Sequence, residues 1–176
     1  MKITESKLEG VYIIEPKVFQ DNRGLFLETF RVSDYKNKIG ISETFVQDSI
    51  SRSSQGVLRG MHFQKNNPQG KLVHTLKGEV FDVVVDIRKD SKTFGSWIGE
   101  YLSEENRKQF WIPPGLAHGF VVISEYADLY YKLTKYYDPV DEGCLIWNDG
   151  DVGIKWPINE PMLSPKDREG LLFKEL

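Results

Sequence analysis

The sequence is poor in the residues that cross-link or anchor a protein: Cys144 is its one cysteine, and nowhere do about 18 apolar residues run together. A single cysteine excludes an intrachain disulfide and fits a reducing compartment. Residues 1–6 contain no apolar signal-peptide core. The formal net charge of only −3 argues against a general nucleic-acid or membrane binder. We therefore expect a cytoplasmic protein with no nucleic-acid and no membrane partner.

Short strands dominate the secondary structure that the sequence predicts. The 176 residues fit one domain, residues 1–176, because domains usually have about 100–200 residues and no linker divides the chain. Residues 80–88 alternate with the two-residue period of a strand, and glycine and proline turns separate many such segments. This pattern predicts an all-β fold, a double-sheet jelly roll or small barrel. Further strands are expected at 11–14, 109–112 and 129–137, and short helices at 32–38 (capped by Ser33), 103–108 and 165–169.

Two of the three histidines lie in segments rich in glycine and aromatic residues, His62 within 56–64 and His118 within 113–120. A second histidine two residues away on a strand would allow chelation of a metal, but Gly60 and Gln64 occupy those positions beside His62. A lone imidazole near cationic side chains favours proton transfer beside an anion. The alternative is a core histidine bonded to a backbone carbonyl. We expect no metal and no cofactor.

Two cationic residues, Arg59 and Lys71, flank His62 in the sequence. The turn at 66–70 predicts antiparallel pairing that brings Lys71 close to His62 on the adjoining strand. There an ammonium would keep the imidazole neutral and stabilise an enolate oxygen. Strict alternation places Arg59 and His62 on opposite faces, so both can line one cavity only if the strand is irregular at Gly60. We predict that irregularity.

Four tyrosines crowd the segment 130–137, in which Tyr131 and Tyr137 share strand parity. They either form a packed aromatic face, or one phenol transfers a proton opposite the base while another ring stacks on a nucleobase. Asp167 is by default a solvated or helix-start carboxylate. It becomes functional if the C-terminal segment folds back so that Asp167 pairs with His62.

Other candidates also have two explanations. Arg23 lies in a turn leading into a strand, where its guanidinium is suited to clamp a phosphate. For His118, where a loop enters a strand, a structural bond explains the residue as well as a site role does. His74 alternates in phase with Leu72 and Leu76, and we interpret it as structural. The sequence has neither a nucleophile elbow nor a P-loop.

Taken in order, these motifs resemble those of the dTDP-4-dehydrorhamnose 3,5-epimerases over nearly the whole chain. Any single motif is a weak signal, but so many matches in the same order are highly specific. The matching segments are 21–24 with Phe26 and Glu28, 45–48, 56–64, 69–73, 78–88, 93–95, 102–103, 112–113, 117–120, 131–132, 136–137, 147–149, 156–157 and 163–164 with Asp167.

The resemblance implies a cupin-like jelly roll (double-stranded β-helix) with a few short helices, which works without a metal as a homodimer with exchanged N-terminal segments. Its substrate would be a dTDP-sugar: dTDP-4-dehydro-6-deoxy-D-glucose, epimerised at C3 and C5 to dTDP-4-dehydro-L-rhamnose for dTDP-L-rhamnose synthesis. The implied catalytic residues are His62 (base), Asp167 (its partner), Lys71 (enolate stabilisation) and Tyr131 (acid). The implied binding residues are Arg23 and Arg59 (pyrophosphate), Tyr137 (thymine), Gln47, Ser49, His118, Glu142 and Lys166, with Phe26 and Glu28 reaching across the dimer.

Three positions depart from the family's pattern: Ser49 stands where Asn is usual, Leu116 where Phe is usual, and Gly150 where Pro is frequent. They bear on substrate fit rather than on reaction class. The nearest rival function is an epimerase that inverts only C3 or only C5 of a related nucleotide sugar. A metal-dependent cupin isomerase or oxygenase is a second rival. A non-catalytic module that binds sugar nucleotides is the third.

Overall fold

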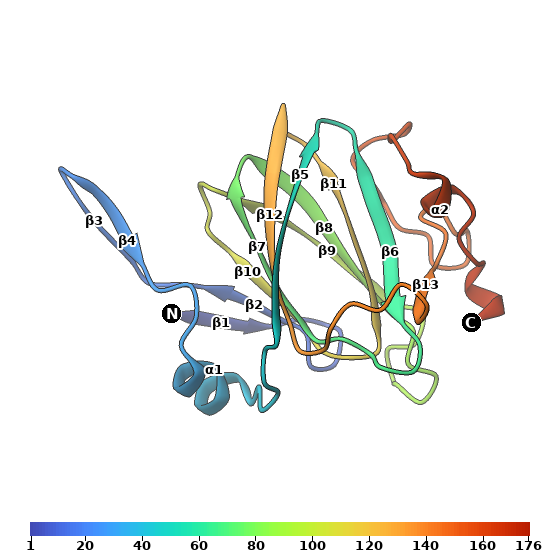
Figure 1. The fold of residues 1–176 in the computed structure, drawn as a ribbon, viewed down its shortest axis with the longest axis horizontal. Helices are drawn as coiled ribbons and strands as arrows, with labels where there is room; N and C mark the ends of the chain where they lie inside the picture. The colour runs from blue at the N-terminus through green and yellow to red at the C-terminus, as the bar shows by residue number, and fades with distance from the viewer.

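Two facing antiparallel sheets form the body of the protein, in a computed structural model that describes residues 1–176 (Figure 1). The six-stranded sheet has the order β1 (Lys2–Glu5), β2 (Tyr12–Glu15), β10 (Gln109–Ile112), β7 (Lys71–Lys77), β12 (Tyr126–Leu133) and β5 (Gln47–Ser54). The five-stranded sheet has the order β13 (Glu142–Cys144), β6 (Leu58–Gln64), β11 (Leu116–Val122), β8 (Glu79–Asp86) and β9 (Trp97–Ser103). The predicted all-β, cupin-like jelly roll is confirmed.

The main core lies between the two sheets, and β8 shows why the sequence folds this way. Val80 and Val84 point inward into a cluster of 13 buried residues. Their neighbours Phe81, Val83 and Val85 point to the other face of the sheet. There the segment after β13 covers them, and β8 therefore carries buried apolar side chains on both faces. This covering segment brings the C-terminal part of the chain against β6 (Figure 1).

The helix α1 (Val32–Ile39) covers the outer face of the six-stranded sheet, where Tyr35 packs with Leu72 and Trp111. The prediction of a helix at 32–38 is confirmed. Ser33 is not its cap, since the N-cap residue is Arg31 and makes no capping bond through its side chain. None of the helices is long and apolar enough to cross a membrane.

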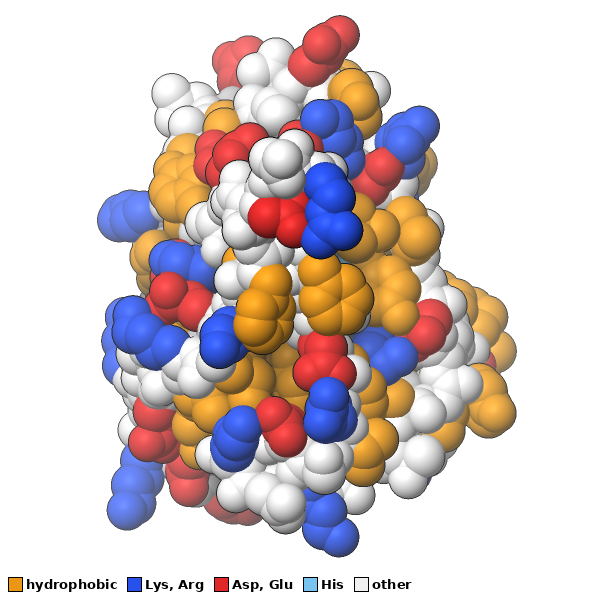
Figure 2. Space-filling model, turned by 90° about the vertical axis from the view of Figure 1, so that its left-hand side faces the viewer, with side chains coloured by type: hydrophobic (Ala, Val, Ile, Leu, Met, Phe, Trp, Pro, Cys, Tyr) orange, Lys and Arg blue, Asp and Glu red, His pale blue; other side chains and the backbone are white.

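A hairpin of β3 (Val18–Asp21) and β4 (Gly24–Leu27) projects from the body, and its strands pair only with each other (Figure 1). Its aromatic side chains are exposed, Phe19 at 52% and Phe26 at 65%. Figure 2 views the molecule from the side of this hairpin and shows hydrophobic side chains at the surface among charged ones. The exposed rings show that the hairpin makes few apolar contacts within its own chain. A two-stranded hairpin is at best marginally stable alone.

Three predicted elements need correction or adjustment. Residues 103–108 form a turn instead of a helix, because Ser103 and Asn106 exchange hydrogen bonds that reverse the chain between β9 and β10. The strand expected at 129–137 is β12, which begins at Tyr126 and ends at Leu133. The helical turn expected at 165–169 is α2 (Pro165–Arg168), and the chain ends in a 3₁₀ turn, η1 (Phe173–Glu175).

The strand β6 is irregular at Gly60, as predicted. Its pairing with β11 shifts register between His118 and Phe120. Gly60 has φ of +140°, and a Cβ there would lie 2.5 Å from the Cα of Gly119. Only glycine therefore fits this close approach of the two strands. The shift lets Arg59 and His62 line the same cavity despite their odd spacing.

Candidate active site

A cavity of about 340 Å³ opens between the two sheets and gathers most of the predicted site residues. Those lining it are His62, Lys71, Tyr131, Arg59, Gln47, Ser49, His118, Tyr137, Glu142 and Lys166. The five-stranded sheet contributes His62 and His118, whereas the six-stranded sheet contributes Lys71 and Tyr131. A ligand in this cavity is therefore contacted from two opposed walls.

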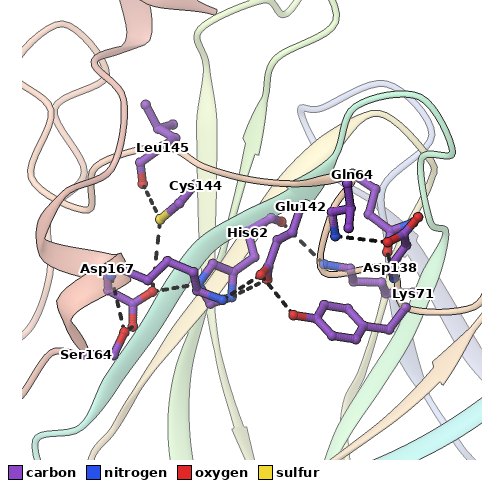
Figure 3. Close-up of polar contacts among 12 residues, drawn as sticks. His62, Gln64, Lys71, Asp138, Glu142, Cys144, Leu145, Ser164 and Asp167 are labelled. Atoms are coloured by element: carbon purple, nitrogen blue, oxygen red, sulfur yellow. Dashed lines mark hydrogen bonds and ion pairs between the residues drawn. The ribbon is translucent and has the colours of Figure 1, made fainter.

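The imidazole of His62 lies between two carboxylates, as Figure 3 shows. On one side its Nε2 is 2.6 Å from Oδ1 of Asp167. On the other side its Nδ1 is 3.8 Å from Oε1 of Glu142. Asp167 is 2% exposed, and Ser164 at the start of α2 donates a hydrogen bond to its Oδ2 over 2.7 Å. The C-terminal segment therefore does fold back to place Asp167 beside His62.

Burial acts to raise the pKa of Asp167, but hydrogen bonds from His62 and Ser164 outweigh it and leave the pKa below its ordinary value. The carboxylate is thus ionised at neutral pH and can only accept hydrogen bonds. Nε2 of His62 must carry the proton in this contact. The free lone pair of the neutral ring is then on Nδ1, the atom on the side of the ring facing Glu142.

Lys71 is buried in the opposite wall, and its Nζ donates to the backbone carbonyl of His62 over 3.4 Å. Burial lowers the pKa of this ammonium to about 8, against the attraction of Asp82 and Glu142. The predicted proximity of Lys71 and His62 is present, but the predicted reason is wrong. Strands β6 and β7 do not pair with each other: they lie in different sheets, so the contact crosses the cavity.

His118 takes part in a buried hydrogen-bond network under the cavity. Its Nε2 lies 2.9 Å from both carboxylate oxygens of Asp82, a residue that is fully buried. Burial raises the pKa of Asp82, while His118 and Lys71 act to lower it. The ring of His118 also lies edge-on to that of Tyr131, with centroids 6.3 Å apart. His118 thus has both a structural bond and a place in the cavity wall.

Tyr131, from β12, faces the cavity from the six-stranded sheet, and its hydroxyl shares a hydrogen bond of 3.0 Å with Oγ of Ser51. Burial raises the pKa of this phenol well above its ordinary value. The phenol is therefore protonated at neutral pH and can donate a proton. The same side chain packs against the core between the sheets, which fixes the ring.

The rim of the cavity is a chain of polar contacts around Tyr137. Oε1 of Gln47 accepts from the backbone N–H of Tyr137 over 2.9 Å, and Nε2 of Gln47 donates to Ser49 over 3.1 Å. The hydroxyl of Tyr137 donates to Oε2 of Glu142 over 3.0 Å, and Lys166 binds the same oxygen over 2.7 Å. The ring of Tyr137 remains about half exposed at 48% and is free to stack.

Three predicted binding residues lie outside the cavity of their own chain. Arg23 is at the tip of the projecting hairpin, paired with Asp21 over 2.6 Å. Phe26 is on the same hairpin, and Glu28 follows it. Arg59, in contrast, lines the cavity and donates to Ser53 over 2.9 Å. Within a single chain, Arg23 and Arg59 therefore cannot hold one pyrophosphate together.

The atoms most suited to bind a metal are those of His62, Cys144 and Asp167, which lie within 4.8 Å of one another. The 2.6 Å between His62 and Asp167 is a hydrogen-bond distance, shorter than the separation of two ligands around one ion. Burial also raises the pKa of the Cys144 thiol to about 11, and a protonated thiol is a poor ligand. These three residues fit a proton-transfer site better than a metal site.

Two residues at the site were missed from the sequence, Ser51 beside Tyr131 and Asp82 beside His118. Asp82 alternates with valines in β8, and nothing in the sequence indicated that its side chain is buried rather than at the surface. Ser51 had a signal, because Ser49, Ser51 and Ser53 alternate along β5 and so share one face.

Together, the fold and the site define a cupin-like jelly-roll protein in which an imidazole, an ammonium and a phenol line one cavity between the two sheets. The model of the dTDP-4-dehydrorhamnose 3,5-epimerase family matches residues 5–175. Proteins of that name from Salmonella typhimurium and Pseudomonas aeruginosa are 53% and 50% identical to the chain, over 99% of this chain and 97% of each relative. The chain belongs to this family of isomerases.

A solved structure from Legionella pneumophila agrees with this assignment. It is described as dTDP-6-deoxy-D-glucose-3,5-epimerase in complex with dTDP-4-keto-L-rhamnose, and it is 49% identical to this chain with a TM-score of 0.96. The match covers 98% of this chain and 93% of that one.

Proposed function

We propose that the protein epimerises dTDP-4-dehydro-6-deoxy-D-glucose at C3 and C5 to dTDP-4-dehydro-L-rhamnose, a step of dTDP-L-rhamnose synthesis. The observation that carries this proposal is the opposition of His62 and Tyr131 across one cavity, on two different sheets. A ketone at C4 acidifies the hydrogens on both C3 and C5. Inversion requires that a proton leave one face of the carbon and that another arrive on the opposite face.

In this mechanism His62 is the general base. Asp167 holds the proton on Nε2, so Nδ1 presents its lone pair to the substrate and removes the hydrogen alpha to the ketone. The imidazolium that forms then lies between the carboxylates of Asp167 and Glu142, which stabilise its charge. This arrangement supports one base serving both carbons.

Lys71 and Tyr131 complete the reaction in the proposal. The ammonium of Lys71 stabilises the enolate oxygen that develops at C4, and burial in the cavity wall strengthens this interaction. The phenol of Tyr131 protonates the carbon from the face opposite His62. No redox step occurs, because the carbon skeleton and the ketone have the same oxidation state before and after.

The nucleotide is bound at the rim in this proposal. Tyr137, half exposed and tied to Gln47 and Glu142, stacks against thymine. Arg59 binds the pyrophosphate, for which a guanidinium fork is suited. Ser49, His118, Glu142 and Lys166 contact the sugar nucleotide from the cavity wall.

The active form is proposed to be a homodimer in which the β3–β4 hairpin reaches the second subunit. The exposed rings of Phe19 and Phe26 would be covered there. The same exchange would carry Arg23, Phe26 and Glu28 to the partner's cavity, where Arg23 could join Arg59 on the pyrophosphate. This explains why these three residues are far from their own cavity.

The reaction is tested by incubating the pure protein with dTDP-4-dehydro-6-deoxy-D-glucose in heavy water and following C3 and C5 by NMR. Exchange at both carbons is expected, and a downstream reductase with NADPH should convert the product to dTDP-L-rhamnose. Exchange at C3 alone or C5 alone would instead assign a single epimerase. His62→Asn should abolish exchange while dTDP binding, measured by calorimetry, is retained; retained exchange would contradict the assignment of the base.

A further inference from the structure

Each inversion leaves the two proton-transfer groups in the wrong state for the next one. This consequence rests on the proposed function. Once His62 has taken a proton from the carbon and Tyr131 has given one, the enzyme holds an imidazolium and a phenolate. Before the second inversion His62 must lose a proton and Tyr131 must regain one. Each group therefore needs a route for protons to or from water.

His62 has an open side through which its proton can leave. Its side chain is 24% exposed, and Nδ1 faces Glu142. The other oxygen of Glu142 contacts the half-exposed Tyr137 and Lys166 at the rim. Tyr131 is different, because the one hydrogen-bond partner of its hydroxyl is Oγ of Ser51, 3.0 Å away. Any proton that re-forms this phenol through an existing hydrogen bond passes through Ser51.

The position of Ser51 on β5 fits this role. β5 is the edge strand of the six-stranded sheet, and its side chains alternate between a half-buried inner face and an exposed outer face. Ser51 shares the inner face with Gln47 and Ser49, and all three line the cavity. Polar side chains thus run along the cavity wall from Tyr131 to the rim, where Gln47 meets the backbone of Tyr137.

We propose that Ser51 delivers the proton that restores the Tyr131 phenol between the two inversions. As the O–H bond of Ser51 breaks and its proton moves to the phenolate oxygen, a water molecule gives a proton to the oxygen of Ser51. The resulting hydroxide is neutralised by the proton that His62 releases, so no proton is gained or lost overall. Ser51 acts through Tyr131 and is a positioning residue. The first inversion does not need it, because Tyr131 begins protonated.

The test compares wild type with Ser51→Ala, Ser51→Thr and a matched control, Ser54→Ala, whose exposed side chain lies on the other face of the same strand. Each is mixed with dTDP-4-dehydro-6-deoxy-D-glucose in heavy water by rapid quench, and deuterium at C3 and C5 is followed with time. For Ser51→Ala we expect a first inversion at nearly the wild-type rate, accumulation of singly inverted sugar, and a steady-state rate about tenfold lower, a modest part of what acid–base help supplies.

Ser51→Thr keeps a hydroxyl and should restore the steady-state rate, and Ser54→Ala should behave as wild type. Equal slowing of both phases in Ser51→Ala, or slowing of neither, would overturn the relay. The wild-type trace separates this failure from the larger one. No exchange at either carbon in wild type refutes the proposed function, whereas exchange at both carbons without a burst in Ser51→Ala removes only the role of Ser51.

Discussion

Replacing Asp167 by asparagine isolates the contribution of one buried charge to the proposed base. The change keeps the shape of the side chain but removes the carboxylate that accepts from Nε2 of His62 over 2.6 Å. Hydrogen bonds to charged groups contribute about 1.5–3 kcal/mol. If that energy stabilises the imidazolium formed in the transition state, kcat should fall by about 10- to 150-fold.

The assay for Asp167→Asn is the rate of deuterium uptake at C3 and C5, measured over a range of substrate concentrations. Asp167 lies behind His62 and does not line the cavity, so KM should stay within about twofold of wild type. Asp151→Asn, at an exposed carboxylate, is the matched control and should have no effect. A variant that keeps more than half of the wild-type kcat, or whose loss is entirely in KM, would refute the reasoning.

Four further outcomes are expected. Because burial lowers the pKa of Lys71 to about 8, kcat should fall as the pH rises through about 8 and the ammonium is lost, and a Lys71→Arg variant should move this alkaline limb upward. Mixing inactive Arg23→Ala and His62→Asn subunits should restore roughly a quarter of wild-type activity if the hairpin completes the partner's site, and none if each site is built from one chain. Gly60→Ala should lower stability by about 2–3 kcal/mol, a fall in Tm of roughly 4–12 °C by calorimetry, with Gly150→Ala as the neutral control in open space. Dialysis against a chelator should leave kcat unchanged, and loss of activity restored by a metal would contradict a free imidazole base.

The sequence predicted which residues gather around the cavity better than it predicted the contacts between them. The irregularity at Gly60 followed from elementary strand geometry, since Arg59 and His62 could reach one cavity in no other way. The proximity of Lys71 to His62 was also expected, but through a hairpin that does not exist. Pairing partners depend on how the whole chain crosses between two sheets, and the turn at 66–70 is equally compatible with both outcomes.

The helix predicted at 103–108 was wrong because a turn and a helix cap can be made by the same hydrogen bonds. Ser103 and Asn106 exchange the bonds of a helix cap, yet the chain reverses there because β9 and β10 belong to different sheets. The residue pattern alone did not place the hairpin that carries Arg23 either. Arg23 was expected to clamp a phosphate, and the family resemblance implied that Phe26 and Glu28 reach across a dimer. The three-dimensional arrangement is what separates the hairpin from the cavity of its own chain.

The placement of His62 on one sheet and Tyr131 on the other has a consequence for how this enzyme can evolve. Sheets in a sandwich pack about 10 Å apart, and the cavity lies where core side chains leave part of that space open. If His62 and Tyr131 act as proposed, the distance across which they exchange protons with the sugar is set by the spacing of the two sheets rather than by any loop. Core substitutions that decrease or increase the spacing of the two sheets should change which ring substituents are accepted. They should preserve the proposed proton transfer at opposite faces of the sugar.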